Sequence, residues 1–196
     1  MTRPNAVLLA CVASLVVVAA TPALGSTIGT TNTGGGYSQI LHYSPIGQTF
    51  TAVDSTVISA GFYLNTMNPD WPLDGVTVTL YSGSGFAGSV LAADTEYPLA
   101  DFIGWHEFYL GGVSVTPGQM YTLGVSVTGG SPYWGAVYAL GGDTYPDGYA
   151  WVVGDAEQGL DMSFQVTGGA GSVPDAGSTL LLFGIGLVGL RAWRNR

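Results

Sequence analysis

The middle of the chain alternates apolar and polar residues in short runs, and this pattern limits the fold more than any other feature. In one run, Ile58, Ala60, Phe62 and Leu64 point to one side of an expected strand, with small or polar residues between them. The same alternation recurs in three further runs: 76–81, 121–128 and 162–166. A period of two with polar partners predicts strands that have one buried and one solvated face.

Turn-forming residues separate these runs, and helix signals are missing between them. Clusters of Gly, Pro, Asp and Asn occur at 68–70, 74–75, 83–85, 116–118, 129–132, 141–143 and 146–148. Glycine accounts for 31 of the 196 residues, well above the usual ~7%. We therefore expect roughly eight or nine strands in an all-β antiparallel sandwich. A jelly roll is the first choice, and a nine-stranded immunoglobulin-like sandwich is the second.

The charge distribution is one-sided. The four basic residues are Arg3, Arg191, Arg194 and Arg196, there is no lysine, and the formal net charge is −9. A domain without cations has no Lys or Arg to release phosphate counterions, so nucleic acid is excluded as a partner. Internal Lys or Arg salt bridges are excluded as well, and stability must come from apolar burial and hydrogen bonds.

Residues 1–25 have the layout of a secretory signal peptide. A basic start precedes an apolar run over 6–20, and small residues Ala23 and Gly25 stand at −3 and −1 of a cut before Ser26. This order predicts export through the Sec machinery and removal of the segment. An uncut anchor is the alternative, but the run is short for a span of ~20 residues.

The only cysteine, Cys11, raises a second alternative. Leu8 to Cys11 looks like a lipoprotein box, in which the cysteine is acylated. Most of the apolar segment follows Cys11, however, whereas the apolar region of such a signal precedes the cut. We interpret Cys11 as part of the signal, which leaves the rest of the chain without a disulfide or a cysteine nucleophile.

The end of the chain has a second apolar segment, which a basic tail follows. The apolar residues run from 179 to 190, and the tail contains Arg191, Arg194 and Arg196. With its flanks, from Ala176 to Trp193, the segment is about 18 residues or ~27 Å long as a helix. Under the positive-inside rule the tail stays cytoplasmic and the preceding domain lies outside. A buried C-terminal helix is the alternative, but it leaves the arginines unexplained.

The residues before this segment carry a family resemblance. They are Val173, Pro174, Asp175, Ala176 and Gly177. Followed by an apolar helix and an arginine tail, they resemble the PEP-CTERM sorting signal in its Val-Pro-Asp variant. The resemblance implies recognition by an exosortase-type membrane protease, cleavage near the motif, and transfer to the surface or exopolysaccharide layer of a Gram-negative bacterium. This chain has Ala176 where the family pattern has a second proline.

These features divide the chain into five parts. They are a signal peptide (1–25), a Gly/Thr/Ser-rich lead (26–36), a β-sandwich domain (37–168), a linker with the sorting motif (169–178), and a transmembrane helix with its basic tail (179–196). The stretch 47–51, the strand-like runs after it and the closing run 160–166 also resemble exported bacterial modules that look like carbohydrate-binding modules. That resemblance implies a sandwich and sugar binding.

Catalytic signals are sparse. The two histidines are His42 and His106, and no hydrolase or zinc-protease motif accompanies them. His106 and Glu107 are neighbours in an expected strand, so their side chains face opposite sides and His106 is expected at the surface. The glycine patterns at 83–88 and 184–189 lack the βαβ context of a dinucleotide site. We do not expect an enzyme, and we expect no cofactor apart from a structural ion.

Calcium is the one ion that the sequence favours. Asp70 and Asp74, like Asp143 and Asp147, precede a glycine in the same D-x-x-x-D-G spacing. Carboxylates and free carbonyls in glycine-rich loops are calcium ligands. The resemblance to carbohydrate-binding modules adds Asp161 to the candidates. Ordinary turn chemistry explains the same Asp-Gly pairs without a metal.

Aromatic residues are the remaining candidates for binding. Trp71, Trp134 and Tyr145 lie in or beside expected turns, where a flat ring could contact a sugar. The alternative is that these rings fill or cap the core, as large aromatic side chains usually do.

The sequence therefore predicts an exported surface or exopolysaccharide-associated protein with a non-catalytic sandwich for binding or structure. A secreted hydrolase of the same polymer is the alternative, although it needs two carboxylates roughly 5–9 Å apart. A structural adhesin without glycan affinity is a third interpretation.

Overall fold

The computed structural model describes residues 25–31, 35–66, 75–99, 101–129, 134–139 and 143–169. This part of the chain is built of strands and loops, and it contains no helix long and apolar enough to cross a membrane. The helix predicted over 179–196 lies outside the described residues, as does the predicted signal segment up to residue 24. The expected all-β class is confirmed.

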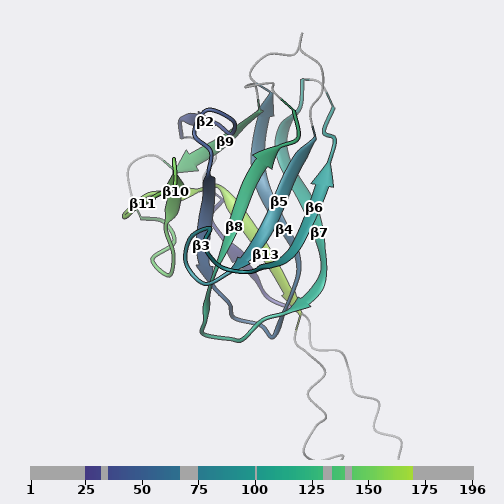
Figure 1. Ribbon diagram of the computed structural model, residues 1–196, viewed down its shortest axis with the longest axis vertical. Coiled ribbons are helices and arrows are strands. Elements are labelled where there is room, and N and C mark those ends of the chain that lie inside the picture. Colours follow the sequence, from purple (N-terminus) through teal and green to yellow (C-terminus); the bar gives the residue numbers. More distant parts are fainter. Residues whose placement is uncertain are drawn as a thin grey trace, which may run out of the picture.

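The strands in chain order are β1 (Thr27–Gly29), β2 (Tyr37–Gln39), β3 (Ile46–Thr51), β4 (Thr56–Thr66), β5 (Val76–Ser82), β6 (Val90–Glu96), β7 (Ile103–Ser114), β8 (Met120–Val127), β9 (Trp134–Ala139), β10 (Ala150–Val152), β11 (Asp155–Glu157), β12 (Asp161–Met162) and β13 (Phe164–Gly169). They form two antiparallel sheets (Figure 1). The first contains β1, β13, β4, β9 and β12, with β7 paired to β4 and β2 to β9. The second has the order β11-β10-β3-β8-β5-β6.

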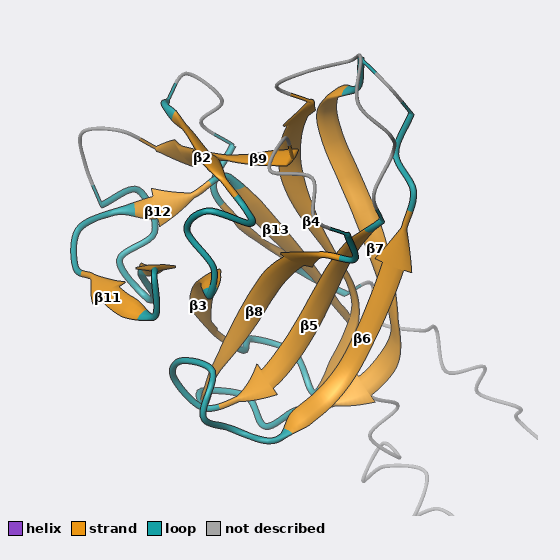
Figure 2. Cartoon of the chain, turned by 45° about the horizontal axis from the view of Figure 1, so that its top comes forward, coloured by secondary structure: helices purple, strands orange, loops and turns teal. Residues whose placement is uncertain are grey.

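Strand β4 organises the first sheet. It pairs with β7 over almost its whole length, while β13 pairs with its first part and β9 with its end. Figure 2 shows β8, β5 and β6 of the second sheet lying across β13, β4 and β7 of the first. This arrangement of two facing antiparallel sheets is the one expected of a β-sandwich.

The alternation along β4 is confirmed with one exception. Ala60, Phe62 and Leu64 are buried as predicted, but Ile58 is 36% exposed. The β4–β7 register shifts between Val57 and Ser59, and Val57 takes the buried position instead. A bulge adds one residue to a strand and so reverses the faces on one side of it. A simple period of two could not show this.

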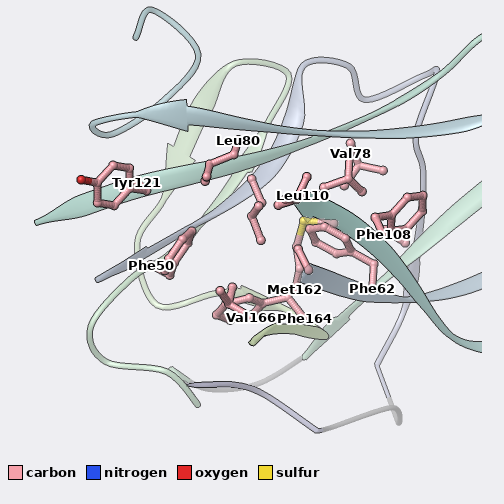
Figure 3. Packing of buried hydrophobic residues seen from close by; sticks show 14 of the residues in the cluster. Phe50, Phe62, Val78, Leu80, Phe108, Leu110, Tyr121, Met162, Phe164 and Val166 are labelled. Atoms are coloured by element: carbon pink, nitrogen blue, oxygen red, sulfur yellow. The ribbon is translucent and has the colours of Figure 1, made fainter. Parts of the chain in front are cut away.

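The core lies between the two sheets (Figure 3). The first sheet contributes Phe62, Phe108, Met162 and Phe164, and the second contributes Phe50, Val78, Leu80 and Leu123, all at 0% exposure. Burying one such side chain stabilises a fold by roughly 1.5–3 kcal/mol. The inward positions predicted for 76–80, 121–125 and 162–166 are therefore confirmed.

His106 differs from its predicted surface position. Its imidazole is half-buried, lies 5.4 Å from the ring of Phe102 and 5.1 Å from that of Phe108, and its Nε2 is buried without a hydrogen-bond partner. The register places it opposite the buried Phe62. Because residues opposite each other in an antiparallel pair share a face, His106 points to the core side of its sheet.

The two ends of the described domain meet. Strand β1 pairs with β13, so part of the expected lead over 26–36 belongs to the first sheet. The amide of Gly168 donates a 2.8 Å hydrogen bond to the carbonyl of Ser26. The start and the end of the domain therefore lie at the same corner.

Candidate functional site

A buried polar contact joins the two sheets. Gln48 of β3 and Asp161 of β12 are both 0% exposed. The Gln48 Nε2 donates to Asp161 Oδ1 at 2.8 Å, and its Oε1 accepts from the amide of Met162 at 2.8 Å. We call this pair the interior polar link. Burying a polar group costs little folding free energy when the group is fully hydrogen-bonded. Here the amide of Gln48 donates to one sheet partner and accepts from another.

The second oxygen of Asp161 holds a loop. Its Oδ2 accepts from the amides of Thr144 at 2.9 Å and Tyr145 at 2.7 Å. The Tyr145 ring packs edge-on against Phe164, with ring centres 5.2 Å apart. Burial is the main cause that raises the pKa of the half-buried Tyr145. The hydrogen bond with the backbone of Thr51 lowers this pKa, and the nearby carboxylates of Asp147 and Asp161 raise it.

The interior polar link bears on the calcium prediction. Both carboxylate oxygens of Asp161 are occupied by hydrogen-bond donors. Asp143 and Asp147 are exposed, and Asp70 and Asp74 lie outside the described residues. Within the described ranges, no group of three or more His, Cys, Asp or Glu is placed to hold a metal ion. Calcium binding stays a prediction, which thermal melts with and without the ion will test.

The predicted glycan contacts are not brought together here. Tyr145 packs on the core residue Phe164 and belongs to the loop that Asp161 anchors. Trp134 starts β9, but its side chain lies outside what the structure describes, and so does all of Trp71. Their role in binding stays a prediction.

A groove of about 210 Å³ on the outer face of the first sheet brings together an aromatic ring and polar side chains, as a ligand site requires. Its residues are Gly61, Trp105, His106, Glu107, Gln165 and Thr167, and we call it the Trp105 groove. Gly61 of β4 lies between Glu107 of β7 and Gln165 of β13 in the register. Since opposite residues share a face, the two longer side chains flank a position that has none. The missing side chain at Gly61 makes the hollow.

The aromatic side of the groove comes from the next row. Tyr63 of β4 is opposite Trp105 of β7, and their rings are 5.8 Å apart in an edge-on arrangement. A Cβ atom on Gly61 would lie 3.9 Å from Trp105 Cε3 and 3.3 Å from the carbonyl oxygen of His106. The half-buried indole therefore borders the space above Gly61. His106 contributes its backbone, because its ring is on the other face.

The polar side of the groove is partly free to bind. Glu107 is exposed, and its Oε1 accepts a hydrogen bond from Ser59 Oγ. Gln165 and Thr167 follow along β13 and are half-buried. An apolar ring, a carboxylate, an amide and a hydroxyl thus surround one hollow. This set can bind a ligand that has both C–H surface and hydroxyl or amino groups.

A second depression of about 210 Å³ lies on the outer face of the other sheet, and we call it the Phe86 depression. Its lining is Ser44, Pro45, Ile46, Thr79, Tyr81, Phe86, Gly124, Val125 and Ser126. The ring of Phe86 is edge-on to Tyr81 at 5.7 Å and to Trp151 at 5.7 Å. None of these described lining residues is charged, and the rings mostly pack against one another. It serves as a matched control for the Trp105 groove.

Sequence reasoning missed the Trp105 groove because its parts are distant in the chain. Gln165 and Gly61 are neighbours only because β13 pairs with β4. The alternation did place Gly61 and Tyr63 on the outward face of one strand. Glu107 was expected in a strand as the neighbour of His106, but the strand order was needed to bring that strand beside Gly61.

Comparison with known proteins adds information at the end of the chain. Residues 172–196 match the VPDSG-CTERM motif. No curated protein and no solved structure matches the chain. The match confirms a PEP-CTERM-like sorting signal, of the kind associated with exosortase-type membrane enzymes, and it indicates an exported, surface-directed protein.

Proposed function

We propose that this exported protein binds extracellular polysaccharide in the Trp105 groove, without catalysis. In this proposal the two-sheet domain is a jelly-roll-like sandwich, the signal peptide is removed on export, and an exosortase-type protease processes the tail before the domain reaches the surface or matrix. The observation that carries the binding proposal is the row Glu107–Gly61–Gln165, with Trp105 bordering the hollow above Gly61.

The residue types in the groove fit a sugar ring. The C–H face of a pyranose packs against an aromatic ring, as other apolar groups do. Its hydroxyls can donate to the carboxylate of Glu107 and pair with the amide of Gln165 or the hydroxyl of Thr167. Exposed polar groups of this kind fix orientation, while the aromatic contact supplies most of the affinity.

Charge narrows the ligand class. Between Arg3 and Arg191 the chain has no Lys or Arg, and all 13 of its acidic residues lie in that stretch. An acidic polymer would meet like charge on the domain, and Glu107 stands in the groove itself. The proposed ligand is therefore a neutral or amino-substituted polysaccharide.

The groove lining supports a non-catalytic role. Glu107 is the only carboxylate that borders it among the described residues. Glycoside hydrolysis generally uses two carboxylates on either side of the scissile bond. One carboxylate with an amide and a hydroxyl is instead a set of hydrogen-bond partners.

The test compares two aromatic truncations, Trp105→Ala and Phe86→Ala, in the exported mature protein. Binding is measured by affinity electrophoresis in gels that contain neutral, amino-substituted or acidic polysaccharides. We expect Trp105→Ala to weaken binding about tenfold or more, the equivalent of about 1.4 kcal/mol. Phe86→Ala, which removes a ring from the opposite face, should bind as the wild type does.

Three results would contradict the proposal. Equal binding by Trp105→Ala and the wild type would remove the groove from the site. Absence of binding to any polysaccharide would favour the structural adhesin. Release of reducing ends by the purified protein would favour the hydrolase.

A further inference from the structure

The first residue after the predicted signal peptide is held by a carboxylate. Asp54 Oδ2 accepts from the backbone nitrogen of Ser26 at 2.8 Å and from its Oγ at 2.6 Å. Asp54 lies in the turn between β3 and β4, and it is half-buried. One oxygen of Asp54 thus accepts two hydrogen bonds from Ser26, which lies 28 positions earlier in the chain.

The surrounding backbone is shaped around this contact. The Ser26 carbonyl is fixed by the amide of Gly168 at 2.8 Å. A Cβ atom on Gly168 would lie 2.2 Å from Asp54 Oδ2, so only glycine leaves room for the carboxylate. Asp54, Ser26 and Gly168 therefore form a small fitted corner at which β1 joins the first sheet.

We propose that signal-peptide removal creates an ion pair here, between the new α-ammonium group of Ser26 and the carboxylate of Asp54. Hydrolysis of the Gly25–Ser26 bond adds the water oxygen and one hydrogen to the Gly25 carbonyl carbon and the other hydrogen to the Ser26 nitrogen. The resulting acid passes its proton to the amine, which leaves a carboxylate on the departing segment and an ammonium on Ser26. The amide that already contacts Asp54 becomes a cation at the same place.

The effect of this change is large for this protein because the domain has no other fixed cation. No Lys or Arg lies between Arg3 and Arg191, so no competing ion pair can form with Asp54. A hydrogen bond between charged partners is roughly twice as strong as a neutral one. The domain is thus stabilised by the same cut that releases it from its signal segment, and the existing anchor of β1 at Asp54 becomes stronger in the processed chain.

The chain offers an unusually selective test. It contains no lysine, so the α-amine is the only primary amine of the processed protein. Acetylation of that amine removes its charge, whereas reductive dimethylation adds bulk and keeps the charge. Mass spectrometry first establishes the mature N-terminus, and thermal melts at pH 6 then compare the two products, because an α-amine of pKa ~7.7–8.0 is charged there.

We expect Ser26 as the first residue and a Tm about 2–4 °C lower for the acetylated protein than for the dimethylated one. In Asp54→Asn the two products should melt together, because the charged acceptor is gone. A mature N-terminus elsewhere than Ser26 would overturn the proposal. So would equal Tm values for the two products in the wild type, or an equally large difference in Asp54→Asn.

Discussion

An amide and a carboxylate are paired at two places in this domain, once in the interior and once on the surface. The interior polar link joins Gln48 to Asp161, and the Trp105 groove sets Gln165 beside Glu107 across Gly61. Each pair is an amide and a carboxylate from different strands. The interior pair is 0% exposed and hydrogen-bonded on every oxygen, while Glu107 is exposed and accepts from Ser59. The two pairs have the same residue types, so the difference lies in burial and hydrogen bonding. A buried pair with all its hydrogen bonds made is structural, whereas an exposed pair is available to a ligand.

The energetics follow from this difference. Removing one partner of a buried, satisfied pair leaves the other donors without an acceptor, at a cost of roughly 1–3 kcal/mol for each group. When an exposed partner is removed, water can replace its hydrogen bonds. The loss in the free energy of unfolding is then usually within about 0.5 kcal/mol. We therefore expect stability to depend on the interior polar link and ligand affinity to depend on the groove.

The largest expected effect is that of Asp161→Ala. It deprives Gln48 Nε2 and the amides of Thr144 and Tyr145 of their acceptor. We expect a loss of about 3–5 kcal/mol in the free energy of unfolding, measured by urea denaturation. Asp161→Asn keeps the shape and one acceptor oxygen, and should lose less. A loss below about 1 kcal/mol for Asp161→Ala would show that the link does not hold the two sheets together.

The second prediction concerns the exposed carboxylate of the Trp105 groove. Glu107→Ala should cost at most about 1 kcal/mol in the free energy of unfolding, because the carboxylate is exposed and only the hydrogen bond from Ser59 Oγ is lost. We expect affinity for the polysaccharide that the wild type binds to fall about tenfold, as it does when a hydrogen bond to a charged group is lost. Asp155→Ala, at an exposed acid of β11, is the matched control. Equal affinities of the two variants would break the comparison.

The sequence predicted the interior of the domain better than its surfaces. The alternation located the buried faces of β5, β8 and β13 because burial repeats every second residue within one strand. Gln48 and Asp161 both lie in segments that we recognised, but their pairing spans 113 positions and depends on strand order. The bulge at Val57–Ser59 and the buried Nε2 of the half-buried His106 depend on tertiary contacts in the same way.

The sorting signal shows the opposite case. Residues 173–177 and the arginine tail lie in one contiguous segment that matches the motif, so sequence alone was enough. The Trp105 groove needs three strands, β7, β4 and β13, to be neighbours, and no local pattern contains that information. Sites built across a sheet are therefore the part of such a protein that a single sequence reveals least.

The smallest expected effect concerns Tyr145, which lies on the loop held by Asp161. Burial raises the pKa of its phenol in the folded protein, whereas an unfolded tyrosine titrates near 10. Between these values the unfolded chain has lost the proton and the folded chain keeps it. The contribution of Tyr145 to stability is therefore complete below about pH 10 and declines as pH rises through the folded pKa.

Replacing Tyr145 with Phe removes this titration and keeps the ring on Phe164. Near pH 8 the loss should stay below about 1 kcal/mol, because the hydroxyl contacts with Thr51 are long, at 3.3 and 3.5 Å. Urea denaturation from pH 8 to 11 should show wild-type stability falling more steeply than that of Tyr145→Phe. Parallel curves would contradict this prediction, because they would show that the phenol of Tyr145 makes no pH-dependent contribution to stability.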